Sequence, residues 1–183
     1  MSTPSIRLTR NSHHRKSPNR LLHIQITANL GKQYVSYVRS HLIAAHKILH
    51  PALNDLSLAF VGDADMSRLH EQFMSIAGPT DVLTFPLEEE AGGRIIAGEV
   101  VICVPEARRQ SRKMGTSVER ELLLYALHGM LHLCGFDDRT PSGYQVMHRT
   151  EDQILKRLGV GAVFVPQSAG RGNHRRADRT GVK

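Results

Sequence analysis

Two histidines stand four residues apart in the most apolar stretch of the chain. Residues 122–134 read LLLYALHGMLHLC, and His128 and His132 are the strongly polar side chains within them. In an α-helix this spacing is just over one turn, so both rings leave the same face about 6 Å apart along the axis. A helix of this kind can offer two nitrogens to one metal ion. The alternative is two hydrogen-bonded core histidines, each of which would need its own buried partner.

A glycine and two aspartates follow this stretch. Gly135 is suited to a left-handed helix C-cap, which would turn the chain back on itself and bring Asp137 or Asp138 beside the histidine face. We propose Asp138 as the third ligand, and His148 as the alternative if Asp138 is not one. Three protein ligands with one open position are typical of a catalytic zinc site, so we expect one Zn²⁺ per chain. Asp137 is also interpreted as a carboxylate that orients a ligand histidine.

Three segments resemble the YbeY-type metalloprotein family. HGMLHLCGFDD, at residues 128–138, is similar to the family signature His-Gly-x-Leu-His-Leu-x-Gly-(Tyr/Phe)-Asp-His. PTDVLTFP, at residues 79–86, resembles Pro-Thr-Asp-Val-Leu-Ser-Phe-Pro, and AGEVVICVPEARRQS, at residues 97–111, is a looser match. The order and spacing of the three segments agree with the family over residues 21–160.

The resemblance implies a function as well as a site. Members of this family are single-strand-specific, metal-dependent endoribonucleases that act in ribosomal RNA processing. We therefore expect a phosphodiester hydrolase that acts on single-stranded RNA, in 3′-end maturation of small-subunit rRNA and in ribosome quality control. The expected partners are rRNA, the small ribosomal subunit and its assembly factors. The resemblance also places the second segment beside the cleft, which makes Thr80, Asp81 and Thr84 candidates for substrate contacts.

Two positions depart from the family pattern. The third ligand is usually a histidine, whereas Asp138 stands here; aspartate is also an accepted zinc ligand. Many relatives carry an arginine where this chain has Met74, so a cation for the scissile phosphate must come from elsewhere, and Arg139, Arg68 or a residue of the basic tails are the candidates. Both departures favour an alternative function, a ribosome-assembly binding factor whose metal is largely structural.

A zinc-dependent peptidase is a further alternative. Zinc peptidases of the His-Glu-x-x-His type carry a glutamate base directly after the first histidine, and Gly129 stands at that position here. This difference disfavours a peptidase, although Glu99 and Asp137 are weak candidates for a catalytic base.

Patterns of apolar residues predict the elements that must position these groups. Alternating apolar residues indicate strands, and apolar residues spaced three and four apart indicate helices. Thr116 followed by Glu119 fits a capping box at the start of the histidine helix. We expect strands at 21–27, 56–62, 82–85 (closed by Pro86) and 94–104, and helices at 32–49, 63–77, 105–114, from 117, and 143–158. This order predicts an α+β fold, with a small mixed β-sheet of about four strands packed with helices and the metal site on a buried helix.

Length and charge bound the remaining possibilities. The 183 residues fit one domain at 21–160 with tails at both ends, and no apolar run approaches the ~20 residues that span a membrane. We therefore expect a cytoplasmic protein without a membrane partner. The two cysteines provide no disulfide framework.

The basic character is concentrated in the predicted tails. Residues 1–20 contain five Arg or Lys and no acid, and residues 161–183 contain five and one acid, within a total net charge of +7. Both segments are poor in apolar residues, so we expect them to be flexible. They are interpreted either as attracting RNA phosphates or as solvated ends.

Overall fold

The computed structural model describes residues 21–161, in which four strands form one mixed sheet. The order across the sheet is β1-β2-β4-β3, with β1, β2 and β4 parallel and β3 antiparallel to β4 at one edge. The strands are β1 (His23–Ala28), β2 (Asp55–Val61), β3 (Val82–Glu89) and β4 (Ile95–Cys103). This arrangement confirms the predicted α+β fold with a small mixed sheet. The predicted tails lie outside the described residues, apart from residue 161.

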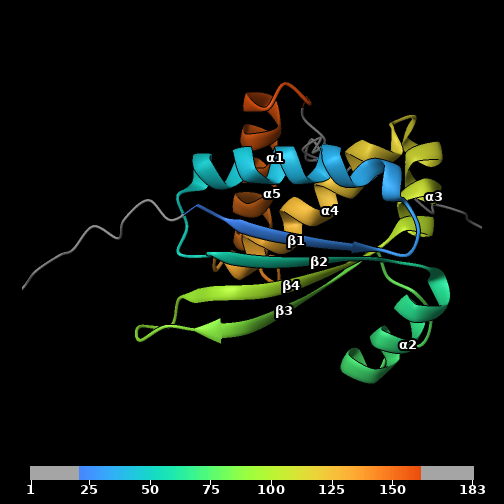
Figure 1. Cartoon of the computed structure of the whole chain (residues 1–183), viewed down its shortest axis with the longest axis horizontal. Coiled ribbons are helices and arrows are strands. Elements are labelled where there is room, and N and C mark those ends of the chain that lie inside the picture. Colours follow the sequence, from blue (N-terminus) through green and yellow to red (C-terminus); the bar gives the residue numbers. More distant parts are fainter. Residues whose placement is uncertain (1–20, 162–183) are drawn as a thin grey trace, which may run out of the picture.

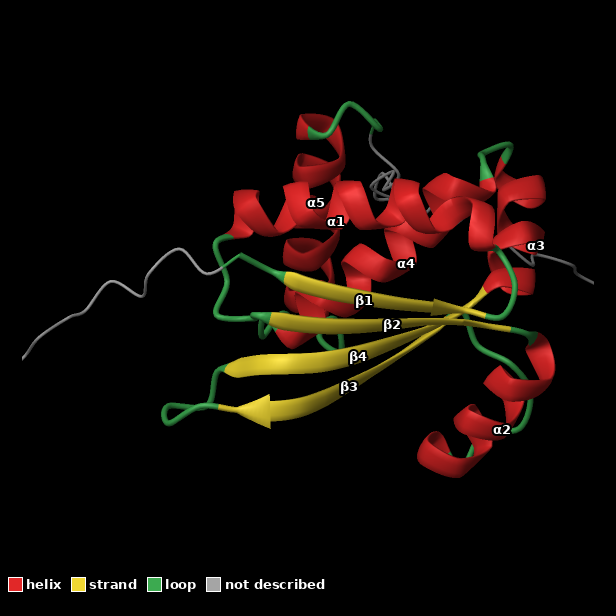
Figure 2. Cartoon of the chain, viewed as in Figure 1, coloured by secondary structure: helices red, strands yellow, loops and turns green. Residues whose placement is uncertain are grey.

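Most of the helices cover one face of the sheet. In Figures 1 and 2, α1 and α4 lie across this face with α5 behind them, whereas α2 lies on the opposite side, beyond the end of β2. Within residues 21–161, no helix is both long and apolar enough to cross a membrane. The helices are α1 (Val35–Leu49), preceded by a 3₁₀ turn (Lys32–Tyr34), α2 (Asp63–Met74), α3 (Val104–Met114), α4 (Val118–Leu133) and α5 (Pro141–Arg157).

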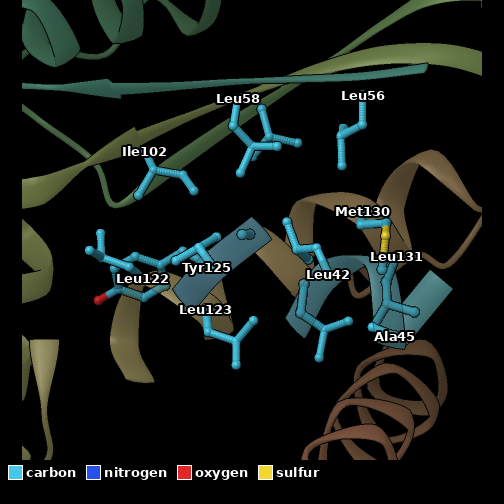
Figure 3. Packing of buried hydrophobic residues seen from close by; sticks show 14 of the residues in the cluster. Leu42, Ala45, Leu56, Leu58, Ile102, Leu122, Leu123, Tyr125, Met130 and Leu131 are labelled. Atoms are coloured by element: carbon cyan, nitrogen blue, oxygen red, sulfur yellow. The ribbon is translucent and has the colours of Figure 1, made fainter. Parts of the chain in front are cut away.

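Helix α4 lies at the centre of the hydrophobic core. It packs against α1, α3, α5 and both strands of the β3–β4 pair. Figure 3 shows side chains from α4 meeting Leu42 of α1 and the strand residues Leu58 and Ile102. Leu42 and Ile102 have no exposed surface, and Leu58 is 2% exposed. Burial on several sides holds α4 in place, so any group on it has a well-defined position.

Two local predictions were wrong. Strand β3 continues through Pro86 to Glu89, because β3 is an edge strand and its register shifts at Pro86, where proline is tolerated. The N-cap of α4 is Ser117 rather than Thr116: the hydroxyl of Ser117 accepts a hydrogen bond from the Arg120 amide.

Candidate metal centre

A tight turn at the end of α4 carries the chain back toward the two histidines. Gly135 adopts φ +91°, its amide donates to the carbonyl of His132, and the amide of Phe136 donates to the carbonyl of Leu131. These are the two hydrogen bonds of a Schellman motif, which a residue without a Cβ adopts most easily. The turn brings Asp138 back beside the exposed face of α4, as the sequence predicted.

Three side chains converge at this face. Nε2 of His128 lies 3.1 Å from Nε2 of His132, and the carboxylate oxygens of Asp138 lie 3.6 Å and 3.8 Å from these two nitrogens. Tetrahedral ligands at zinc bond lengths lie about 3.3 Å apart, so these separations match the edges of a zinc coordination shell. Within residues 21–161, these three residues are the group whose donor atoms could hold a metal ion.

The hydrogen bonds of each ring determine which nitrogen faces the shared point. Nδ1 of His128 lies 2.8 Å from a carboxylate oxygen of Glu151, and Nδ1 of His132 lies 3.1 Å from the carbonyl oxygen of Phe136. A carbonyl and a carboxylate only accept hydrogen bonds, so both Nδ1 atoms donate, and in the neutral rings both Nε2 atoms present lone pairs. Two such lone pairs 3.1 Å apart beside a carboxylate are satisfied by a shared proton or by a metal ion. The residues therefore fit a metal ion.

Exposure distinguishes a catalytic site from a structural one. The side chains of His128, His132 and Asp138 are 20%, 30% and 30% exposed, so the point they share is reached from solvent. Structural zinc sites are closed by four protein ligands, whereas catalytic sites keep one position open. Three ligands in a partly open setting match the catalytic type.

Glu151 links the centre to the final helix. Only 2% of this residue is exposed, and its second carboxylate oxygen lies 2.5 Å from Nδ1 of His148. The rings of His128 and His148 are roughly stacked, with centroids 6.1 Å apart. His148, the alternative ligand, therefore shares a carboxylate with His128 but does not join the three-residue cluster.

The electrostatic surroundings favour positive charge at His128. Burial lowers the pKa of His128, but the hydrogen bond and charge of Glu151, with the charges of Asp138 and Asp81, raise it more, so the pKa lies above its ordinary value. Cys134 follows α4 but does not belong to the three-residue cluster, and burial raises the pKa of its thiol to about 12.

Neither of the two weak candidates for a base belongs to the three-residue cluster. Asp137 is paired with Arg139 through two nitrogens at 2.8–3.0 Å, and this pairing lowers the pKa of Asp137 to about 2. Glu99 lies on β4 between Gly98 and Val100, which both face α4, so its side chain points to the opposite face of the sheet. Of these two carboxylates, only Asp137 is near the proposed ligands.

The second sequence segment does border the site. A groove of about 720 Å³ is lined by both histidines, and Asp81, Thr84 and Arg139 also line it. Asp81 accepts hydrogen bonds from the Thr80 hydroxyl and the Val82 amide, which fixes its carboxylate at the start of β3. Thr80 does not line the groove, but its hydroxyl donates to the Asp81 carboxylate, which does.

Close packing explains the glycine between the histidines. A Cβ at Gly129 would lie 2.7 Å from a methyl group of Val100 and 3.0 Å from the Thr84 hydroxyl. Helix α4 therefore approaches the sheet where Gly129 crosses β3 and β4, which brings Thr84 near His128. The same contact leaves no space for the glutamate that a peptidase of the His-Glu-x-x-His type would need at this position.

One residue of the site was not predicted as such from the sequence. Glu151 orients His128, and the available signal was an acidic residue on the apolar face of the last helix, beside Met147, Ile154 and Leu155. The resemblance placed Met74 where relatives carry an arginine for the phosphate, and Met74 lines the groove although it ends α2, on the other side of the sheet.

The fold and the centre together define a class: a small α+β protein with a candidate three-ligand metal centre on a central helix. The family model described as "Endoribonuclease YbeY" matches residues 19–159. The chain belongs to the YbeY family.

Individual relatives agree with this assignment. The "Endoribonuclease YbeY" of Beutenbergia cavernae is 42% identical over 114 residues, covering 58% of this chain and 75% of that protein. The protein of the same name from Pelotomaculum thermopropionicum is 40% identical over 111 residues, covering 58% and 73%. The solution structure of TM1509 from Thermotoga maritima shares the fold, with a TM-score of 0.51 and 24% identity over 75% of this chain and 92% of that one.

Proposed function

We propose that this protein is a metal-dependent endoribonuclease that cleaves single-stranded RNA. The observation that carries the proposal is the convergence of His128, His132 and Asp138 at a groove open to solvent. The relatives named as endoribonucleases support the same activity. Family membership further supports a place in 3′-end maturation of small-subunit rRNA and in ribosome quality control, with the small subunit and its assembly factors as partners in the cytoplasm.

We assign a role to each group at the site. His128, His132 and Asp138 would hold one Zn²⁺, a metal that imidazole and carboxylate ligands suit. When bound, the ion supplies Lewis-acid chemistry toward a phosphate and toward water. Glu151 keeps Nδ1 of His128 protonated, so that the lone pair of Nε2 remains available to bind the metal.

Arg139 is the groove cation proposed to contact the phosphate. Its side chain is 85% exposed, is paired with Asp137 and lines the groove, so it can meet a phosphate from the solvent side. Asp81 and Thr84 lie on the wall formed by β3, where they can contact ribose hydroxyls. Arg68 is paired with Asp65 on α2 and does not line the groove. The basic segments 1–20 and 161–183 are proposed as phosphate contacts outside the domain at 21–160, with an affinity that falls as salt rises.

The first test is the metal content of the purified protein. We expect about one zinc per chain in the wild type and little in His132→Ala or Asp138→Ala, because two remaining ligands bind weakly. His23→Ala is the matched control, since His23 is 75% exposed and pairs with Asp55 at the far edge of the sheet. Zinc retained in Asp138→Ala would move the third ligand to another residue, and no zinc in the wild type would contradict the metal centre.

The second test is cleavage of RNA. Zinc-loaded wild type should cut a single-stranded RNA faster than the same sequence in a duplex, and His128→Ala should abolish cutting while the protein stays folded. If His128→Ala unfolds, or if the folded wild type cuts no RNA, the metal is structural and the binding-factor function replaces this proposal.

A further inference from the structure

Apolar side chains form much of one side of the groove, next to Asp81. Phe73 and Met74, at the end of α2, are 53% and 56% exposed, and Phe85 on β3 meets Phe73 edge to face at 4.8 Å between ring centroids. Met74, Phe85 and Pro86 line the groove that also contains the histidines, and Phe73 lies beside the groove through its contact with Phe85. We call Phe73, Met74, Phe85 and Pro86 the apolar rim.

Buried residues hold Phe85 in place, whereas Phe73 and Met74 are exposed to solvent. Phe85 packs against a small buried cluster that includes Met66, Leu83 and Val101 on the face of the sheet opposite α4. Exposed apolar residues scattered singly need no explanation, but a contiguous group beside a site indicates a binding surface. Ile76, two residues beyond Met74, is also 52% exposed.

The two walls of the groove differ in chemistry. One presents His128, His132 and Arg139. The other presents the aromatic, thioether and proline surface of the rim, with the Asp81 carboxylate at the start of β3. A nucleotide likewise has a charged part and an apolar part, because it joins an anionic phosphate to a flat ring with an apolar face. Unpaired bases stack on aromatic side chains, whereas bases within a duplex have no free face to offer.

We propose that the apolar rim stacks the unpaired bases of an RNA strand whose phosphate lies at the histidine wall. This inference rests on the proposed ribonuclease function and adds a physical origin for its single-strand preference. The rim selects strands by the availability of base faces, with Phe73 and Phe85 as the aromatic platform and Met74 as an adaptable contact.

The experiment compares binding of fluorescent oligoadenylate with binding of an equally long abasic ribose-phosphate chain, by anisotropy. Phe73→Ala combined with Met74→Ser should weaken oligoadenylate binding about ten- to hundredfold and leave abasic binding unchanged. Phe73→Tyr keeps the ring and should bind like the wild type. Met114→Ser is the matched control, because Met114 also ends a helix, is 62% exposed, and does not line the groove.

The possible outcomes test base stacking by the rim separately from RNA cleavage. If the rim variant is folded by circular dichroism and binds oligoadenylate like the wild type, the rim does not stack bases, and a protein partner becomes the alternative occupant. If the wild type cuts RNA but binds both oligomers equally, the base-stacking proposal is wrong and the ribonuclease proposal stands. A wild type that prefers oligoadenylate through the rim but cuts no RNA overturns the ribonuclease alone.

Discussion

Glu151 donates no atom to the candidate metal centre, yet it lies 2.8 Å from Nδ1 of the ligand His128. It is 2% exposed, and its other oxygen is taken by His148, so the carboxylate joins α5 to α4 through two imidazoles. A carboxylate in this position fixes the orientation of the ligand ring and raises its basicity.

Glu151→Gln should therefore weaken zinc binding without removing any ligand. The amide keeps the shape but loses the charge, and changes to such supporting residues typically lower metal affinity about 10- to 100-fold. Competition with a chromophoric chelator measures the affinity. Glu71→Gln on the exposed side of α2 is the control and should bind zinc like the wild type. An unchanged affinity in Glu151→Gln would show that the carboxylate does not support the ligand.

The sequence predicted those parts of the candidate site that depend on residues close together in the chain. The spacing of His128 and His132 puts both rings on one helix face, and Gly135 predicts the turn that returns Asp138 to that face. Regular alternation also predicted the strands, and the order of the elements along the chain predicted the mixed sheet. These features depend on backbone geometry within about ten residues, which residue types determine directly.

The parts that the sequence did not predict depend on contacts between distant segments. Glu151 lies 23 residues from His128, and no periodicity relates the two. Glu99 was a candidate base because it is an acid within an apolar strand, but only the contact of Gly98 with Leu133 shows which face of β4 meets α4. Met74 was placed at the site by the family resemblance alone, since the packing of α2 under the sheet is not specified by the sequence of α2 itself.

Gly129→Ala should destabilise the fold by overpacking. The added methyl group would lie 2.7 Å from Val100, and inserting a methyl into a packed core costs about 1–3 kcal/mol. For a chain of this size the melting temperature should fall by roughly 2–12 °C. Combining Gly129→Ala with Val100→Ala should cost less than the sum of the two single changes, as a double-mutant cycle of thermal melts would show. Simple additivity would contradict direct packing between the two residues.

The ion pair between Asp63 and Arg109 predicts a specific pH dependence. Hydrogen bonds from Arg109, at 2.7 Å and 2.9 Å, lower the pKa of Asp63 below its ordinary 3.8. Because the folded state favours the ionised carboxylate, the pair stabilises the protein above pH 3.8, and this stability is lost as the pH falls through the lower folded pKa.

Asp63→Asn should therefore lower the melting temperature at neutral pH by about 1–3 °C, since the pair is half exposed, and by less at a pH below the folded pKa. Asp65→Asn, which removes a single contact to Arg68 at 3.2 Å on the same helix turn, is the control and should show a smaller effect. A loss that is equal at both pH values would contradict a role for the charge of Asp63.

The turn after α4 should matter more for metal binding than for stability. Gly135→Ala would force a residue with a Cβ into φ +91°, at a cost of about 1–2 kcal/mol, and would displace the segment that carries Asp138. Gly159→Ala is a closely matched control, because Gly159 has φ +76° after α5, and a Schellman pair of hydrogen bonds involves its amide and that of Val160. Both variants should lose similar stability in thermal melts, while only Gly135→Ala should lose zinc affinity. Equal zinc affinity in the two variants would show that this turn does not position Asp138 as a ligand.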